Sequence, residues 1–117
     1  MKISIDLTSI PNQKTGVGKY AMALIKALGK FDNENYYWIF VKRNQTEDFN
    51  PKKKNFHIVL CSNILQSKTL RILWEQFILP LYIKRLKIDL LHSIHYTIPL
   101  FAGCKVVVTF HDMTFFL

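Results

Sequence analysis

Two glycines near the amino end of the chain could bind a phosphate group. The segment Thr15-Gly16-Val17-Gly18-Lys19-Tyr20 follows an apolar stretch at residues 2–7 and opens a helical pattern that runs to about Phe31. Glycines at a helix start leave backbone N–H groups open to a ligand, and the helix dipole adds partial positive charge there. We therefore expect Gly16, Val17 and Gly18 to contact a phosphate or a sugar. The alternative is that these glycines only permit a tight turn and close helix packing.

A histidine and an aspartate follow an apolar run later in the chain. His111 and Asp112 come directly after residues 105–110, which include Val106-Val107-Val108. A histidine there can donate a hydrogen bond to a sugar hydroxyl, and the neighbouring carboxylate can accept one or act as a base. We expect a functional role for both residues. The alternative is a turn at the end of a strand, capped by Asp112.

The elements that must position these residues follow from the pattern of apolar side chains. We expect helices at 16–31 and 67–87, with strands at 2–7, 36–41, 56–60, 88–93 and 105–110. This order predicts an α/β, Rossmann-like fold with a mainly parallel sheet and helices on both faces. Ligands of such sheets bind outside the carboxyl ends of the strands. The glycine turn, His111, Asp112, Ser93 and His95 should therefore converge on one edge.

The same pattern predicts which helical faces are buried. In the first helix, the expected apolar face consists of Val17, Tyr20, Ala21, Leu24, Leu28 and Phe31, and Gly29 with Asp32-Asn33 should end the helix. In the long helix, the expected inward residues are Leu70, Leu73, Trp74, Phe77, Leu81 and Ile78, with Arg71, Lys84, Arg85 and Lys87 outside. Pro80 should kink or split this helix. Residues 43–55 are polar and are expected to form a surface loop.

Charge and cysteine content narrow the possible partners. The net charge of +8 over 117 residues favours anionic partners such as nucleotides, phosphorylated sugars or acidic lipids. Because the basic residues are spread along the chain, nucleic acid is not an expected partner. Cys61 and Cys104 form no metal or redox motif, and the spacing of His92, His95 and His111 does not suggest a metal site. A cytoplasmic location is the expectation, with a possible peripheral contact at the inner face of the membrane through the cations of the long helix.

One enzymatic alternative is an oxidoreductase that binds NADP. The segment Gly16-Val17-Gly18-Lys19-Tyr20-Ala21 formally matches the dinucleotide pattern, and Lys42-Arg43 could suit a 2′-phosphate. The match is weak because the first glycine should follow the strand directly, whereas here about eight residues intervene. A basic, non-enzymatic binding module is the other alternative.

Several segments together resemble the amino-terminal domain of glycosyltransferase family 4 enzymes, which have the GT-B fold. The similarity covers nearly the whole chain and keeps the order of the segments. Its pieces are Ile3-Ser4-Ile5-Asp6-Leu7, Lys14-Thr15-Gly16-Val17-Gly18-Lys19-Tyr20, Trp74-Glu75-Gln76 with Leu79-Pro80, Asp89-Leu90-Leu91-His92-Ser93 and Val107-Val108-Thr109-Phe110-His111-Asp112.

The resemblance implies retaining transfer of a sugar from a nucleotide diphosphate sugar to a glycan or lipid-linked acceptor, with no metal or other cofactor. It implies that Gly16 and Gly18 lie near the donor diphosphate or the acceptor. His111 would contact the transferred sugar, and Asp112 would shape the acceptor side.

Family members also carry a second, nucleotide-sugar-binding domain. We therefore expect residues 1–117 to be a partial amino-terminal domain without that second domain, inactive alone or completed by a separate chain.

Overall fold

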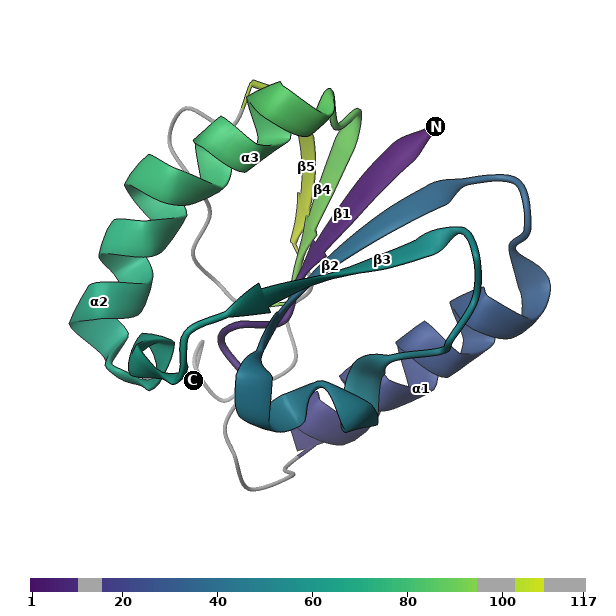
Figure 1. Cartoon of the computed structure of the whole chain (residues 1–117), viewed down its shortest axis with the longest axis horizontal. Helices are drawn as coiled ribbons and strands as arrows, with labels where there is room; N and C mark the ends of the chain where they lie inside the picture. The colour runs from purple at the N-terminus through teal and green to yellow at the C-terminus, as the bar shows by residue number, and fades with distance from the viewer. Residues whose placement is uncertain (11–15, 95–102, 109–117) are drawn as a thin grey trace, which may run out of the picture.

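Five parallel strands form a single sheet in the order β3-β2-β1-β4-β5 (Figure 1). The structure is a computed structural model, and it describes residues 1–10, 16–94 and 103–108. The strands are β1 (Lys2–Asp6), β2 (Tyr36–Lys42), β3 (Phe56–Cys61), β4 (Leu90–Ser93) and β5 (Lys105–Val108). This all-parallel arrangement confirms the predicted α/β, Rossmann-like fold class.

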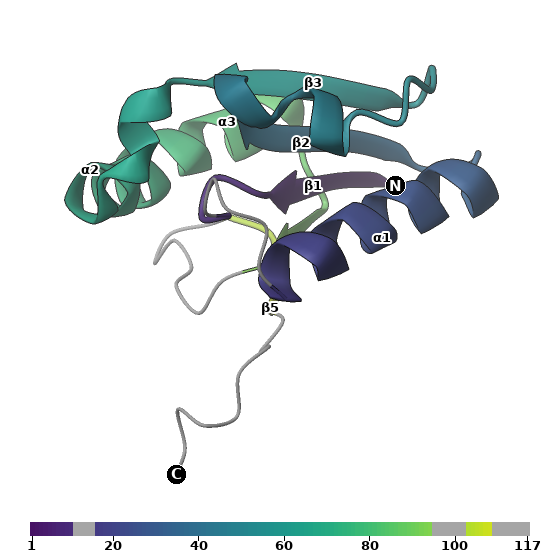
Figure 2. The same ribbon diagram turned by 90° about the horizontal axis from the view of Figure 1, so that it is seen from below.

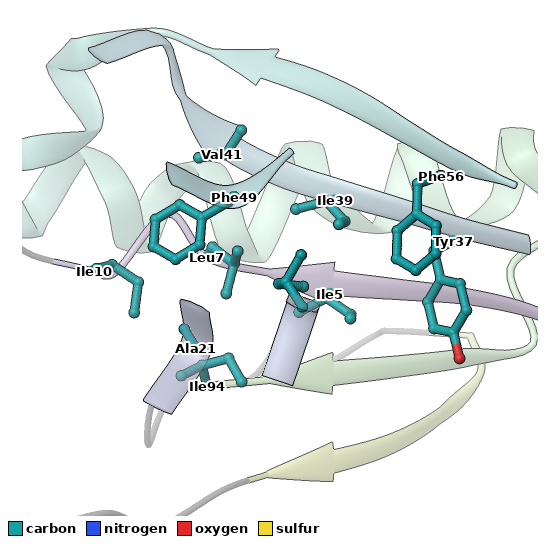
Figure 3. Close-up of a cluster of buried hydrophobic side chains, with 11 residues drawn as sticks. Ile5, Leu7, Ile10, Ala21, Tyr37, Ile39, Val41, Phe49, Phe56 and Ile94 are labelled. Atoms are coloured by element: carbon teal, nitrogen blue, oxygen red, sulfur yellow. The ribbon is translucent and has the colours of Figure 1, made fainter. Parts of the chain in front are cut away.

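The strand β1 lies at the centre of the sheet, and its side chains alternate between the two faces. Ile5 is opposite Ile39 of β2 and His92 of β4. Ile5 packs in an apolar cluster with residues of β2 and β3 on the face covered by α1 (Gly16–Phe31), as Figure 3 shows. Its neighbour Asp6 therefore points to the opposite face.

Helix α1 covers the first face and has the predicted bounds. Ala21 and Ile25 are buried there, whereas Tyr20 and Phe31, predicted to face inward, are exposed. Gly29 does not end the helix, which continues to Phe31. A Cβ atom added at Gly29 would lie 2.8 Å from Cβ of Pro51, so this glycine lets the helix approach the connection between β2 and β3.

That connection contributes to the core and is more than a surface loop. It contains two short 3₁₀ turns, η1 (Arg43–Gln45) and η2 (Glu47–Phe49). Phe49 and Gln45 are buried, and the Gln45 side-chain amide donates a 3.2 Å hydrogen bond to the carbonyl oxygen of Ile10. Residues 43–55 are mostly polar, so the sequence alone did not indicate that Phe49 is buried in the core.

The opposite face is covered by a continuous helical segment between β3 and β4, preceded by the 3₁₀ turn η3 (Asn63–Gln66). Helix α2 (Lys68–Leu73) passes through a π-helical turn, η4 (Trp74–Ile78), into α3 (Leu79–Leu86). The amide of Leu79 donates to the carbonyl oxygen of Trp74, five residues back. Pro80 follows immediately, and the wider turn accommodates its ring, which would clash in a regular helix. The segment is therefore not split at Pro80, and the predicted distortion is the π-helical turn that precedes this residue.

The predicted inward face of this segment is wrong except at Trp74, which is buried as expected. Arg71, Glu75, Leu79 and Ile83 are buried at four-residue spacing, together with Trp74. The expected core residues Leu70, Leu73, Phe77, Ile78 and Leu81 are exposed instead, and Arg71, expected outside, is buried. The π turn adds a residue to one turn, so the buried row advances by four rather than 3.6 residues.

At the amino ends of the strands, a hydrogen-bonded cluster ties α1 to the sheet. The carboxylate of Asp32, just after α1, accepts hydrogen bonds from the Tyr37 hydroxyl and from the backbone and side-chain amides of Asn35. These donors hold the pKa of Asp32 well below its usual range, the Tyr37 hydroxyl contributing most. The side chain of Asn55 bridges the carbonyl oxygens of Asp32 and Asn35.

Candidate functional site

The carboxyl ends of β1 and β4 lie side by side at the centre of the sheet. Asp6 and Ser93 are opposite each other in the parallel register. The chain leaves β1 toward α1 on one face, whereas it reaches β4 from α3 on the other face, as Figures 1 and 2 show. This change of direction makes a topological switch point, which is where open α/β sheets bind ligands.

Asp6 is buried at this point and is hydrogen-bonded on both oxygens. Its Oδ1 accepts a 2.6 Å hydrogen bond from the Thr8 hydroxyl and a 3.0 Å bond from the Thr8 amide. Its Oδ2 lies 3.3 Å from a guanidinium nitrogen of Arg71. A buried carboxylate needs such partners because burial strongly disfavours an unpaired charge.

The helical layer supplies the charges that surround Asp6. The same nitrogen of Arg71 lies 3.6 Å from Oε1 of Glu75, one helical turn later. Asp6 and Glu75 have side-chain exposures of 0%, and Arg71 has 7%. We call Asp6, Arg71 and Glu75 the buried charge cluster. It fixes the end of β1 against α2 and η4, and therefore fixes where the following loop begins.

Cys61, at the end of β3, is chemically quiet in this environment. Burial, together with the negative charge of Asp6, raises the pKa of its thiol to about 12. Burial also raises the pKa of Cys104. Because the thiolate is the reactive form, a raised pKa lowers the reactivity of both thiols.

The predicted glycine turn forms the start of α1. Gly16 is exposed, and a Cβ atom added to it would meet nothing within 4 Å, so its backbone is open to a ligand. Gly18 is buried, which suits close packing of the helix, and Lys19 beside it is exposed. Val17 lies in the same turn, but its side chain is outside the described part. The first turn of α1 contains no acidic residue, so an anion would meet no carboxylate from that turn.

The other predicted site residues divide into two groups. Ser93 is buried at the end of β4, opposite Asp6, as its predicted position at a strand end requires. His95, His111 and Asp112 lie outside the described residues. Their convergence with the glycine turn stays a prediction.

Two further sequence expectations concern histidine and lysine. His92 is half-buried within β4, next to the fully buried Leu91. Within residues 1–10, 16–94 and 103–108, no three histidine, cysteine or acidic side chains gather as a metal site would require. Lys42 is buried and only Arg43 of that pair is exposed, so the two side chains do not present a joint surface to a 2′-phosphate.

Sequence reasoning missed the buried charge cluster. One signal was available: Asp6 interrupts a short apolar strand expected at the centre of a sheet, and a buried carboxylate requires a cation. Nothing local identifies Arg71 as that cation, since the two residues are 65 positions apart.

Among the described residues, no helix has the length and apolar character needed to cross a bilayer.

The family of this chain was also sought by comparison with known proteins. Comparison with protein-family models, curated proteins and solved structures finds no match to this chain.

Proposed function

We propose that this chain is the amino-terminal, Rossmann-like unit of a sugar-transferring enzyme of the glycosyltransferase family 4 type. Its substrate is a nucleotide diphosphate sugar, and the reaction is retaining transfer to a glycan or lipid-linked acceptor. The observation that carries the proposal is the switch point between β1 and β4. Asp6 and Ser93 are opposite each other there in the strand register, and the chain continues from β1 to the glycine start of α1.

The proposed division of labour follows from charge and exposure. The open amides at Gly16 and the cation of Lys19 bind a phosphate of the substrate. The buried charge cluster stays out of the reaction and holds the end of β1 in place, because its carboxylates are already paired with Arg71. His111 and Asp112 take the roles that the family resemblance implies, contact with the transferred sugar and shaping of the acceptor side.

A binding experiment with a matched pair of variants tests the phosphate contact. We expect uridine or guanosine diphosphate sugars to shift the amide NMR signals of Gly16, Gly18 and Ser93. Gly16→Asp should weaken this binding about fivefold or more, since it places a carboxylate where the helix start attracts an anion. Gly16→Asn is the control of equal size, and a Cβ atom at this position meets no neighbouring atom within 4 Å.

Two outcomes would contradict the proposal. One is a set of shifted signals that excludes the glycine turn. The other is equal affinity of the Gly16→Asp and Gly16→Asn variants. A parallel titration with NADPH tests the oxidoreductase alternative, which requires NADPH to bind more tightly than the nucleotide sugars.

A further inference from the structure

The outer side of the α2–η4–α3 segment carries a row of exposed apolar side chains. Phe77 is 69% exposed and Leu81 is 65% exposed, values that are high for such large apolar residues. We call the following set the outer apolar row: Leu70, Leu73, Phe77, Ile78, Leu81 and Tyr82, all of them exposed.

Helix geometry shows that Leu73, Phe77 and Leu81 of this row point away from the sheet, whereas the Tyr82 ring at its edge packs on the buried Phe40, with ring centroids 5.4 Å apart. Leu81 is two residues from both Leu79 and Ile83, which are buried against the sheet, so it projects from the opposite side of α3. Phe77 and Leu73 precede Leu81 at four-residue steps and lie on the same side. The segment is the outer layer of the fold on this face, as Figure 1 shows.

The charges around the outer apolar row are all of one sign. Lys68, Lys84, Arg85 and Lys87 are exposed along the same segment. Glu75 is the only acidic residue between positions 68 and 87, and it is buried in the charge cluster. The charged side chains exposed on the segment are therefore all cations.

Two surface hollows flank Leu81 and place cations beside it. One, of about 570 Å³, is lined by Ile78, Leu81 and Tyr82 with Lys84 and Arg85. The other, of about 510 Å³, lies on the side of Gly103 and includes Lys84 and Lys87. Each hollow has an apolar lining and lysine or arginine beside it, as a phosphate headgroup with attached hydrocarbon would require.

We propose that this surface docks on an anionic lipid membrane, with the α2–η4–α3 segment lying in the plane of the interface. Phe77 and Leu81 enter the boundary between headgroups and acyl chains, and the surrounding cations contact lipid phosphates. A second copy of this chain is a poorer occupant, because pairing the two surfaces would bring like charges together. The proposal goes beyond the proposed function and does not depend on it.

Co-sedimentation with lipid vesicles tests the proposal. The full chain should sediment with vesicles of equal parts phosphatidylcholine and phosphatidylglycerol, and much less with phosphatidylcholine alone. Phe77→Asp and Leu81→Asp should each lower the partition coefficient at least about tenfold, because each removes a large buried apolar side chain from the interface. Lys84→Gln with Arg85→Gln should lower it about tenfold or more on the mixed vesicles.

The matched control lies on the other side of the sheet. Phe31 is 77% exposed at the end of α1, and the Lys30 ammonium lies 5.3 Å from its ring centroid, so it also pairs an exposed aromatic with a cation. Phe31→Asp should leave binding unchanged. Circular dichroism checks that each variant is folded.

Three outcomes would overturn the docking surface. They are failure to bind anionic vesicles, equal loss of binding in the Phe31 and Phe77 variants, and a dimer in solution that Phe77→Asp separates. None of these measurements uses a nucleotide sugar, so their outcome is distinguishable from failure of the proposed function.

Discussion

The two helical layers bury different kinds of side chain. On one face, α1 packs Ala21 and Ile25 against the sheet and leaves its charged residues outside. On the other, the α2–η4–α3 segment turns Arg71 and Glu75 inward and leaves Phe77 exposed. The helical spacing of apolar residues therefore identifies a row of side chains on one side of a helix, but it does not decide whether that row faces the sheet.

The position of Asp6 explains the difference between the layers. This carboxylate points to the face covered by α2, where an uncompensated charge would cost about 3–5 kcal/mol. With Arg71 facing Asp6, the segment buries Leu79 and Ile83 in place of the other predicted residues, and Trp74 stays buried as predicted. This orientation therefore buries a different set of apolar side chains in place of the predicted one, and it also pairs Arg71 with Asp6.

Removing the cation of the buried charge cluster should have the largest effect. Arg71→Ala leaves the carboxylates of Asp6 and Glu75 buried without their cation, and should lower the free energy of unfolding by about 3–5 kcal/mol. Urea denaturation measures this change. Lys84→Ala, an exposed cation of the same layer, should stay within about 0.5 kcal/mol of the parent chain. Equal losses in the two variants would show that the charge cluster has no special role.

Truncating one apolar residue in each layer sharpens the contrast. Ile25→Ala opens a cavity under α1 and should cost about 2–4 kcal/mol. Leu73→Ala in the outer apolar row should cost under about 1 kcal/mol, since its side chain is half in water already. Thermal unfolding of both variants gives the difference. A larger loss for Leu73 would mean that the assigned outward face is wrong.

Gly16 and Gly29, near the two ends of α1, should respond in opposite directions to the same change. Gly29→Ala places a Cβ atom 2.8 Å from Pro51 and should destabilise the fold by about 1–2 kcal/mol, despite the better helix propensity of alanine. Gly16→Ala meets no neighbouring atom and should be neutral or slightly stabilising. Chemical denaturation of the pair measures both. Stabilisation by Gly29→Ala would show that α1 can move away from Pro51 at little cost.

The smallest expected effect concerns acid stability at the end of α1. Because the pKa of Asp32 is lowered in the folded chain, its contribution is present above its ordinary value near 4 and is lost as the pH falls below that value. Tyr37→Phe removes the strongest donor to Asp32. The free energy of unfolding of the Tyr37→Phe variant should therefore decrease less steeply on acidification than that of the parent chain. Tyr36→Phe, an exposed neighbour, should retain the parent profile.

Local pattern was enough to predict most of the sheet and α1. The apolar runs of β1, β2 and β3 lie between polar segments, so their existence follows from short-range sequence alone. The bounds of α1 were also predictable, since its glycine start and the Asp32 region after it are both visible in the sequence. Phe49 was not, because one aromatic in a polar segment carries no periodic signal.

The orientation of the second helical layer could not be predicted in the same way. The segment has two apolar rows, and the π turn before Pro80 shifts the phase between them. The choice depends on the contact of Arg71 with Asp6, which is distant in sequence. For the site, strand ends were sufficient to place Ser93 and the glycine turn, whereas the buried charge cluster required the tertiary structure.

The central position of β1 has a consequence for the chain during its synthesis. Of the five strands, β1 leaves the ribosome earliest, yet one of its two neighbours is β4, which begins at Leu90. At about 5–20 residues per second, several seconds pass before that neighbour is made. During this interval the nascent chain exposes one open edge of β1, and until Arg71 emerges Asp6 also lacks its cation. Of these five strands, the earliest to be made thus waits for β4 before both of its edges are paired, and an unpaired strand edge is open to association with other chains.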